Sequence, residues 1–465
     1  MTTEERREFL LGVIRNSLEE MNPGHAVRKN LVFDEENRVL EIAGQKVELG
    51  EGQKVWITGV GKAAVTMAKA AGEILGSRLA EGLVIAPDQP EEKLLRIQVL
   101  KGSHPVPDKE SLSSTYELLH FAKSIPDEAP VLCMLSGGAS ALLCMPDGRL
   151  EIEDVGTLHK MLLESGMDIH QMNTVRKVIS RVKAGGLLRT LAHTQLFDLV
   201  ISDVPGDNLS SIGSGPTTFE EKQFNEAFRL LKQYELWNRL PHQVRVYIAR
   251  GMHEPIDHTA PEPFRHHSEI ISSAGMLAEK TAAELKKNGV DARVIHPAYN
   301  DSIENVEKKI LQEMNSVLEG GQGFSQDSGE NQNGENGQSG QNDPADENPE
   351  KQALIFYGES SVNVSGSGKG GRNQELALRI AMHLNEAVPV SFASIGTDGV
   401  DGPTDSAGAL VDETTIRSAE SKQINPASYL SNNDSYSFFN KAGGHIKTGP
   451  TGNNLMDLQV LLISP

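Results

Sequence analysis

The ten residues from 366 to 375, GSGKGGRNQE, combine the residue types that bind anions. Four glycines accompany Lys369 and Arg372, and an apolar pattern with the period of an α-helix follows directly. Glycines allow several backbone N–H groups to converge on one anion, and the N-terminus of a helix adds partial positive charge. The segment therefore predicts a phosphate-binding loop, to which the lysine and the arginine add full charges.

Two established loop motifs can be compared with this segment. A Walker A loop requires Ser or Thr after its lysine, whereas Gly370 follows Lys369, so that motif is excluded. A dinucleotide-binding fingerprint, G-x-G-x-x-G, does fit Gly366, Gly368 and Gly371. A glycine-rich connection with solvated charges explains the same residues, and the segment alone does not decide between the two.

A second glycine turn lies near the start of the chain. The apolar run 55–58 predicts a buried strand, and Gly59, Gly61 and Ala64 fit the G-x-G-x-x-A variant of the same fingerprint. Lys62 stands at the start of the helix that follows, where its ammonium could reach an anion held by the turn amides. An exposed lysine on a first helical turn is an equally good explanation.

A third junction begins with the apolar strand 131–135. Ser136, Gly137 and Gly138 follow it and precede a short helical pattern. This arrangement indicates either an anion-binding turn or tight packing of the strand against the helix. The surrounding residues lack the G-x-S-x-G pattern of a nucleophile elbow, so Ser136 is not expected to be a nucleophile.

Two further features predict structural roles when taken alone. His104, in the proline-rich turn SHPVPD, is expected to be a hydrogen-bonding residue rather than a catalyst. The segment 172–188 predicts a helix, and most of its basic residues are expected to form a solvated face. Those residues are Arg176, Lys177, Arg181 and Lys183.

Aspartates follow two predicted strands and could bind a cation. Asp203 comes after the strand 199–202, and Asp398 is one of three aspartates in the glycine-rich segment after the strand 390–395. Open α/β sheets place their ligands at such strand ends, and Mg²⁺ is commonly bound by one or two carboxylates together with a substrate phosphate. Turn-forming aspartates are the alternative. No EF-hand or zinc template fits the sequence.

Composition limits the class of protein. The chain has 465 residues, which predicts two or three domains, and 38% hydrophobic with 23% charged residues is typical of a soluble globular protein. The sequence lacks the basic patch that a nucleic-acid partner would require. It also lacks an apolar run that would predict a signal peptide or a membrane span. Cys133 and Cys144 are expected to be reduced and buried. We expect a cytoplasmic protein without nucleic-acid or membrane partners.

The acidic net charge of −20 is partly local. Residues 320–352 contain seven acids and one lysine, which supply −6 of it. Their low-complexity composition predicts a disordered insertion without a catalytic role. Prolines between residues 255 and 263 predict a break that would suit a domain hinge.

Eight motifs in a fixed order resemble the glycerate 2-kinase family whose C-terminal part is called the MOFRL domain. They are GVGKAAVTMAKAA, SHPVPD, LSGGASALL, MNTVRKVISRVKAGG, SDVPGDNLSSIGSGPT, GGRNQELALRIA, GTDGVDGPTDSAGA and TGPTGNNLMDL. The resemblance implies two α/β domains with mostly parallel, Rossmann-like sheets around a central cleft. Residues 1–258 would form the N-terminal glycerate kinase domain, and residues 266–465 the MOFRL-type domain. It also implies transfer of the γ-phosphoryl group of ATP, with Mg²⁺, to the 2-hydroxyl of D-glycerate.

The family's catalytic lysine and arginine fall on Lys62 and Arg372. We hypothesise that these two face each other across the cleft and clamp the transferred phosphoryl group and the glycerate carboxylate. We assign Asp203 and Asp398 to the metal. The residues expected to bind substrate or phosphate are Gly61, Ser136, Gly137, Gly138, Asn173, Arg176, Gly371, Gln374 and Glu375.

Two other functions are compatible with the residues. The fingerprint-like loops would suit an NAD(P)H-dependent hydroxypyruvate reductase, which NADH oxidation with hydroxypyruvate would reveal. A binding module for acidic sugars or nucleotides that lacks catalysis is the non-enzyme alternative, and the presence of both Lys62 and Arg372 argues against it. The kinase would work as a monomer or a homodimer.

Overall fold

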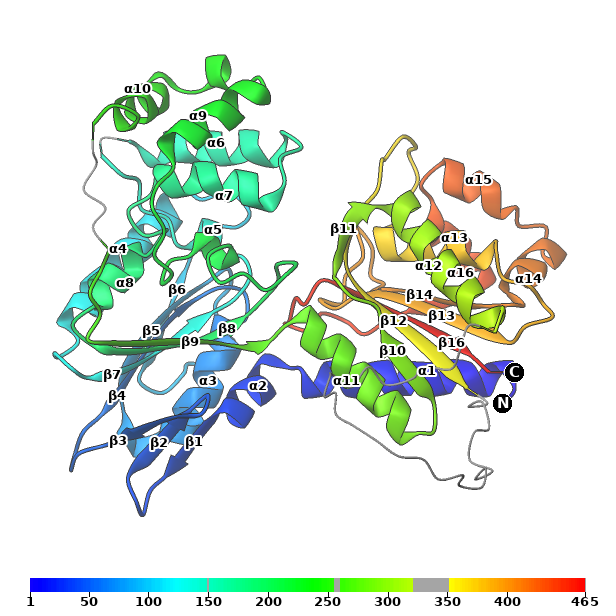
Figure 1. Cartoon of the computed structure of the whole chain (residues 1–465), viewed down its shortest axis with the longest axis horizontal. Coiled ribbons are helices and arrows are strands. Elements are labelled where there is room, and N and C mark those ends of the chain that lie inside the picture. Colours follow the sequence, from blue (N-terminus) through cyan, green and yellow to red (C-terminus); the bar gives the residue numbers. More distant parts are fainter. Residues whose placement is uncertain (149, 255–259, 321–350, 465) are drawn as a thin grey trace, which may run out of the picture. The chain divides into compact units, whose positions relative to one another are not determined.

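The computed structural model of the chain describes residues 1–148, 150–254, 260–320 and 351–464 (Figure 1). Their contacts form two compact units, which we call the N-terminal and the C-terminal unit. The N-terminal unit comprises Glu19–Ser273 and Gly452–Leu455, and the C-terminal unit comprises Met1–Leu18, Ala274–Thr451 and Met456–Pro465. The expected insertion at 320–352 and the expected hinge near 255 lie largely outside the described residues.

Helix α1 (Thr3–Glu20) corrects the expectation that residues 1–258 form one domain. Arg6 is buried and donates hydrogen bonds to Glu413 and to Ser391 Oγ, while Arg7 pairs with Asp412. These contacts place most of α1 in the C-terminal unit. Its partners lie hundreds of residues further along the chain, so nothing in the local sequence indicates them.

A parallel six-stranded sheet forms the centre of the N-terminal unit. Its strands are β4 (Val55–Val60), β5 (Leu79–Ala86), β6 (Ile97–Lys101), β7 (Pro130–Leu135), β8 (Gln195–Ile201) and β9 (Arg265–Ser272). They lie in the order β6-β5-β4-β7-β8-β9, and every neighbouring pair is parallel. This is the strand order of a Rossmann fold, whose winding reverses between β4 and β7. The expected Rossmann-like sheet is confirmed for this unit.

Helices cover both faces of this sheet, as strands that are buried on both sides require. On one face lie α2 (Pro23–Asn30) and α3 (Ala64–Leu75); on the other lie α4 (Lys109–Ser124), α5 (Ala139–Leu142) and α8 (Gly186–Leu191). Alternate residues of β7, such as Cys133 and Leu135, contribute to the core beneath α4 and α8.

A separate helical layer belongs to the same unit (Figure 1). It consists of α6 (Ile152–Leu163), α7 (Ile169–Val178), α9 (Phe224–Gln233) and α10 (His242–Gly251), which share their own apolar core. Helix α7 starts with a capping box, in which Asp168 and Gln171 bind each other's backbone amides. The unit also contains a small antiparallel sheet of β1 (Leu31–Asp34), β2 (Val39–Ile42) and β3 (Gln45–Glu48).

The sheet of the C-terminal unit is mixed, which corrects the expectation of mostly parallel strands. Its strands are β10 (Asp291–Val294), β11 (Tyr299–Ser302), β12 (Gln352–Ser361), β13 (Val390–Gly396), β14 (Gly408–Asp412), β15 (His445–Ile446) and β16 (Asp457–Ile463). Strands β10 and β11 run parallel to β12, and the remaining pairs are antiparallel. No helix links β13 to β14, and the loop 397–407 is too short for the crossover that a parallel connection needs.

Helices also cover both faces of this second sheet. Helix α12 (Ile303–Leu318), α13 (Arg372–Ala381) and α16 (Ser435–Ala442) pack over Leu354, Phe356 and Phe392. Helix α11 (Ala274–Lys287) contacts β10 and β12, and α1 reaches Ser391 on the strand face opposite to Phe392. Two shorter helices, α14 (Thr415–Ser421) and α15 (Pro426–Ser431), complete the unit.

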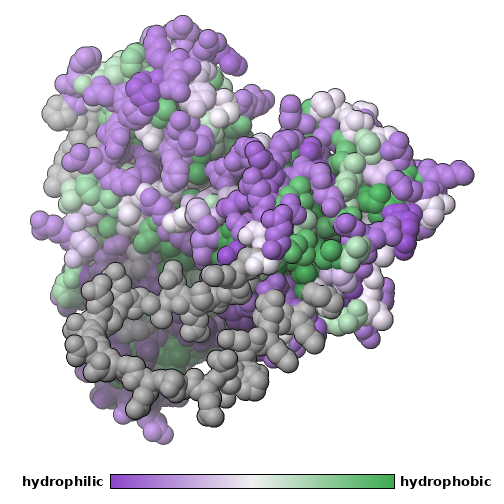
Figure 2. Space-filling view, turned by 45° about the vertical axis from the view of Figure 1, so that its right-hand side comes forward, coloured by the Kyte–Doolittle hydropathy of each residue, from purple (hydrophilic) through white to green (hydrophobic). Residues whose placement is uncertain are grey.

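The surface and the thiols agree with the composition. Hydrophilic side chains dominate the face shown in Figure 2. Within the described ranges, no helix combines the length and apolar character needed to cross a membrane. Cys133 and Cys144 are both free and buried, as expected, and burial raises the pKa of each thiol.

Candidate functional site

The carboxyl edge of the parallel sheet gathers most of the predicted residues of the N-terminal unit. Val60 pairs with Leu135 in the sheet, so the turns that begin at Gly61 and Ser136 leave the same edge side by side. This is the point between β4 and β7 at which the winding reverses. Rossmann-like sheets open a crevice at such a point and bind their ligands there.

The turn at Gly61 is shaped by close packing against Ser136. Gly61 has φ of 138°, and a Cβ at this position would lie 2.1 Å from Ser136 Oγ. The Gly61, Lys62 and Ala63 amides donate to Ile85 O (3.1 Å), Gly137 O (2.9 Å) and Ser136 Oγ (3.0 Å). Because the protein itself accepts from these amides, they are not available to a pyrophosphate. The fingerprint at Gly61 is therefore a packing motif, and the Lys62 side chain remains exposed beside it.

The turn at Gly137 and Gly138 differs from the Gly61 turn in the partners of its backbone amides. Among the described residues, no acceptor is recorded for either amide. A Cβ at Gly138 would lie 3.2 Å from both Lys62 Cγ and His104 Cδ2, and one at Gly137 would lie 2.2 Å from Asp203 Oδ2. Two glycines therefore allow a lysine, a histidine and an aspartate to approach one backbone turn.

Helix α7 and the segment after β8 contribute a second group of residues. Asn173 Nδ2 donates to Ser211 O (3.0 Å), and Asn173 Oδ1 accepts from Ser214 Oγ (2.9 Å) and Arg176 Nη1 (3.5 Å). Arg176 is 5% exposed, and its Nε is buried without a hydrogen-bond partner. Asn173 thus links α7 to the loop, and Arg176 keeps unused donors.

The expectation of a solvated basic face on this segment is wrong for three of its four residues. Arg176, Lys177 and Lys183 are buried, and Arg181 is exposed. Lys177 pairs with Glu220, whereas Lys183 donates to Ser140 O (2.7 Å) and Leu143 O (3.0 Å). The residues turn inward because the loop after β8 and the helix α5 supply acceptors that the linear sequence does not reveal.

These groups create a strongly positive environment. Burial lowers the pKa of Arg176 to about 10 and that of Lys183 to about 8. Packing around the His104 ring, followed by the charges of Lys62 and Arg176, lowers the pKa of His104 to about 4, although the residue keeps solvent exposure. The buried His159 has a pKa well below its usual value because of burial, Arg176 and Lys183.

Direct ion pairs within the described residues do not neutralise this positive charge. In the described part of the chain, Lys62, Arg176 and Lys183 form no ion pair with a carboxylate. Buried cations without counter-ions are costly, and functional sites are where such arrangements are concentrated. An anionic ligand would supply the missing charge.

Asp203 lies at the edge of this positive region. It follows β8 and is partly exposed next to Gly137. The described residues contain no group of three or more His, Cys, Asp or Glu side chains arranged to hold a metal. One protein carboxylate combined with phosphate oxygens still fits the way in which Mg²⁺ is commonly bound with a nucleotide.

In the C-terminal unit, the first part of the glycine-rich loop donates its amides to the protein itself. The Gly366 amide donates to Asn433 Oδ1 (2.9 Å), the Gly368 amide to Asn432 O (2.9 Å) and the Lys369 amide to Asp434 Oδ1 (3.0 Å). These acceptors belong to the connection between α15 and α16. These amides are therefore not available to a ligand. Among the described residues no acceptor is recorded for the Gly370 and Gly371 amides, so anion binding by that part of the loop stays a prediction.

The N-terminus of α13 is likewise occupied by a protein carboxylate. Asp401 is buried and accepts from the Asn373 amide (3.0 Å), the Gln374 amide (2.8 Å) and Gln374 Nε2 (2.9 Å). Gly371 is required here because its Cβ would lie 2.2 Å from Asp401 Cγ. The helix end does bind an anion, but that anion is Asp401.

The other predicted residues of this unit have similar internal partners. The fully buried Gln374 also donates to Thr404 Oγ1 (3.1 Å), and the buried Glu375 pairs with Arg379 (3.0 Å). Asp398 Oδ1 accepts from the Val400 amide (3.1 Å), which is a turn interaction. The geometry favours structural roles for Gln374 and Glu375, whereas Asp398 remains partly exposed.

Arg372 also has internal partners, but a third of its side chain is exposed to solvent. It begins α13, keeps 33% of its side chain exposed, and pairs with Glu359 and Asp457. Burial opposes its charge, but the two carboxylates raise its pKa above the usual value. Burial raises the pKa of Asp457 to about 7, against the opposing effects of Arg372 and Asn373. The guanidinium is thus fully charged and held in one orientation.

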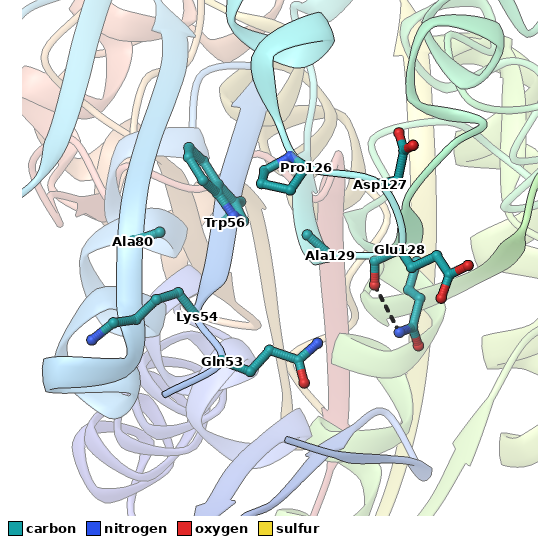
Figure 3. Close-up of a pocket in the computed structure, with 9 residues that line it drawn as sticks. Gln53, Lys54, Trp56, Ala80, Pro126, Asp127, Glu128 and Ala129 are labelled. Carbon is teal, nitrogen blue, oxygen red and sulfur yellow. Dashed lines mark hydrogen bonds between the residues drawn. The ribbon is translucent and has the colours of Figure 1, made fainter. Parts of the chain in front are cut away.

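A hollow of about 480 Å³ lies at the opposite, amino edge of the parallel sheet (Figure 3). Its lining residues precede or begin the strands: Gln53, Lys54, Trp56, Ala80, Pro126, Asp127, Glu128, Ala129 and Gln195. Among these residues, Gln195 Nε2 donates to Glu128 O (2.9 Å). Since parallel α/β sheets bind ligands at their carboxyl edge, we do not place the site here.

Sequence reasoning missed three residues at the two sites. His104 was expected to be structural, yet it lies beside Lys62 and Gly138. Glu359 and Asp457 carried no signal as partners of Arg372, because one is near the end of β12 and the other starts β16. Their proximity follows from the pairing of Gly358 with Asp457 in the sheet.

Comparison with known proteins indicates the same family as the sequence motifs. Residues 9–249 match a domain of unknown function, DUF4147, and residues 352–457 match the MOFRL family. The glycerate 2-kinase of Pyrococcus horikoshii is 32% identical over 98% of this chain and 97% of its own length. The D-glycerate 2-kinase of Thermotoga maritima is 31% identical over 99% of both chains.

A solved structure agrees with these relatives. The crystal structure of glycerate kinase from Thermotoga maritima superimposes with a TM-score of 0.81, at 30% identity, over 99% of this chain and 100% of that one. The sequence resemblance and the α/β fold are thereby confirmed. The chain belongs to the glycerate kinase family that combines a DUF4147 domain with a MOFRL domain.

Proposed function

We propose that the protein is a glycerate 2-kinase, which transfers the γ-phosphoryl group of ATP to the 2-hydroxyl of D-glycerate and releases ADP and 2-phosphoglycerate. One observation carries this proposal beyond family membership. Lys62, Arg176 and Lys183 lie near the carboxyl edge of a Rossmann-like sheet, and within the described residues no carboxylate pairs with them. Both substrates are anions, so such a region is suited to bind them.

The chemistry of phosphoryl transfer explains the residue types. The reaction demands positioning of two anionic reactants and neutralisation of charge on the transferred group, and little covalent work by the protein. We assign Lys62 and Arg372 to catalysis through this neutralisation. The amides of Gly137 and Gly138 and the guanidinium of Arg176 would bind phosphate or carboxylate oxygens, and Asn173 would hold Arg176 in place.

For the predicted metal ion we assign one carboxylate of the N-terminal unit. Asp203 would hold Mg²⁺ together with phosphate oxygens of the nucleotide, and the ion would supply further charge neutralisation. Asp398 stays the second candidate, although its Oδ1 already accepts from a turn amide. Kinase activity with ATP that depends on added Mg²⁺ and falls on Asp203→Asn substitution would support this assignment.

The reductase alternative loses its structural basis. It depended on two loops that would bind the pyrophosphate of a dinucleotide through backbone amides. The Lys62 and Ala63 amides donate to Gly137 O and Ser136 Oγ, and the Gly366, Gly368 and Lys369 amides donate to Asn433, Asn432 and Asp434. The relatives at about 30% identity are also kinases by name.

The deciding experiment follows ADP release with ATP, Mg²⁺ and D-glycerate, and identifies the product by NMR. 2-Phosphoglycerate is the expected product; 3-phosphoglycerate would refute the assigned hydroxyl, and NADH oxidation with hydroxypyruvate would revive the reductase.

Lys62→Met should lower kcat by about 100-fold, the typical effect of removing one group that stabilises transition-state charge. Lys69→Met, on the exposed face of α3, the helix that follows Lys62, is the matched control and should retain wild-type turnover.

Two further expectations stay predictions. We expect a monomer or a homodimer, which sedimentation or size-exclusion chromatography with light scattering would distinguish. A cytoplasmic location without nucleic-acid or membrane partners is expected from the composition and would be checked by cell fractionation.

A further inference from the structure

Two carboxylates of very different exposure hold Arg372. Asp457 is 1% exposed; its Oδ1 accepts a hydrogen bond from Nη2 (3.1 Å), and its Oδ2 lies 2.7 Å from Nε as an ion pair without hydrogen-bond geometry. Nε and Nη2 together form one edge of the guanidinium. Glu359 pairs with Nη1, and 47% of its side chain is exposed. One acid is thus part of the protein interior, and the other faces solvent.

Asp457 is fixed by a buried polar network. Its Oδ1 also accepts from Asn373 Nδ2 (2.9 Å), and Asn373 Oδ1 accepts from Ser394 Oγ (2.7 Å). Gln459, two residues further along β16, accepts from Tyr299 OH (2.7 Å) in the same interior region. Moving Asp457 would deprive the buried Asn373 Nδ2 and the Arg372 guanidinium of this acceptor, which is energetically costly.

Glu359 has no comparable attachment. Arg372 is its one recorded side-chain partner among the described residues, and a charged pair at this exposure contributes little to stability. Replacement of Glu359 by another anion would therefore cost the protein little. The displaced carboxylate would simply return to water.

The stereochemistry of arginine makes the two positions inequivalent. A guanidinium presents five N–H donors in a rigid plane and binds phosphate or carboxylate through two neighbouring donors. With the Nε edge occupied by Asp457, the edge formed by Nη1 and Nη2 is the one that can take a second oxyanion. Glu359 occupies part of that edge.

We propose that Asp457 is a positioning residue that presents Arg372 to the substrate, and that Glu359 is a competing carboxylate which the oxyanion of a substrate displaces. This inference rests on the proposed catalytic role of Arg372. The oxyanion is either a phosphate of ATP or the carboxylate of glycerate, and the kinetic test distinguishes these two sources.

The test compares two isosteric variants. Glu359→Gln removes the competing charge and should lower KM for one substrate about threefold or more, with a smaller change in kcat. The substrate whose KM falls, ATP or glycerate, is the one that Arg372 binds. Asp457→Asn should do the opposite and lower kcat about tenfold or more, because Arg372 loses its fixed orientation.

Controls separate this mechanism from a loss of folding and from failure of the proposed function. Glu386→Gln removes one acid of an exposed ion pair with Arg417 in the same unit, and it should leave both KM values unchanged. Thermal melting followed by circular dichroism shows whether Asp457→Asn folds. If this variant does not fold, Asp457→Glu replaces it in the test, because glutamate keeps the charge. Asp457→Glu should then retain more turnover than an Arg372→Lys variant of the same stability.

Failure of this inference and failure of the proposed role of Arg372 give different kinetic results. Unchanged or higher KM values for both substrates in Glu359→Gln, while Arg372→Met abolishes turnover, would overturn the inference and leave the catalytic role of Arg372 intact. Wild-type turnover in Arg372→Met would instead refute the proposed role of Arg372 itself.

Discussion

Replacing Arg176 by methionine should make the protein more stable and less active at the same time. The side chain is 5% exposed, has an unpaired Nε, and forms no ion pair in the described chain. Burial lowers its pKa from 12.5 to about 10, so the folded protein disfavours the charged form. That shift corresponds to about 3 kcal/mol of destabilisation at neutral pH, where the guanidinium is charged in both the folded and the unfolded chain.

Methionine keeps the length and flexibility of the side chain and removes its charge. The weak hydrogen bond to Asn173 Oδ1 (3.5 Å) is lost, which offsets part of the gain. We therefore expect the free energy of unfolding, measured by urea titration without substrate at pH 7, to rise by about 1–3 kcal/mol. A hydrogen bond to a charged group contributes about 1.5–3 kcal/mol, so kcat/KM in the ADP-release assay should fall by about 10- to 150-fold.

The combination of both results is what tests the reasoning. Arg181 belongs to the same basic segment but is exposed, and Arg181→Met should change neither quantity. A destabilised Arg176→Met variant with wild-type kcat/KM would show that Arg176 is a structural residue and that its burial is compensated within the protein. Loss of both stability and activity would also refute the argument, since it would remove the evidence for an uncompensated cation.

Three other substitutions test separate parts of the structure. Burial lowers the pKa of Lys183 from 10.5 to about 8, so the folded protein binds this proton less tightly than the unfolded chain does. The free energy of unfolding, measured by urea titration, should therefore rise by up to about 3 kcal/mol from pH 8 to pH 10.5. The Lys183→Met variant should lack that rise. His104→Asn should lower kcat/KM about tenfold. It should not move the acid limb of the plot of kcat/KM against pH, because the His104 ring stays neutral above about pH 4. An acid limb near pH 6.5 in the wild type that shifts in the variant would contradict this. Asp401→Ala leaves the Asn373 and Gln374 amides without their acceptor and should lower the free energy of unfolding by about 3 kcal/mol, whereas a loss below about 1 kcal/mol would mean that water replaces the carboxylate.

The burial of the basic segment shows where sequence reasoning stopped. Arg176 and Lys183 have the spacing of a solvated face, and no residue near them in the sequence indicates burial; only the family resemblance assigned Arg176 to ligand binding. Their acceptors, Asn173 Oδ1 and the carbonyl oxygens of Ser140 and Leu143, come partly from another element of the unit. Whether a long cationic side chain is exposed depends on what packs over it, and that is a tertiary property.

The sequence by itself determined the places at which the chain turns and the family to which it belongs. Glycines at 61, 137 and 138 are required by close approach or by positive φ, and the strands before them are apolar enough to be recognised locally. These constraints act within a few residues, so they are visible in the order of residue types. The parallel sheet of the N-terminal unit was implied by the family resemblance that these motifs carry, and it is confirmed.

The tertiary structure alone decided which groups the turns bind. The amides at the start of α13 looked available for a ligand, but Asp401 accepts from two of them, and the loop before them binds residues 432–434. The same distance in sequence hid the partners of α1 and of Arg372. A hydrogen-bond donor is equally satisfied by a ligand and by a distant carboxylate of its own chain, and residue types near the donor do not distinguish the two.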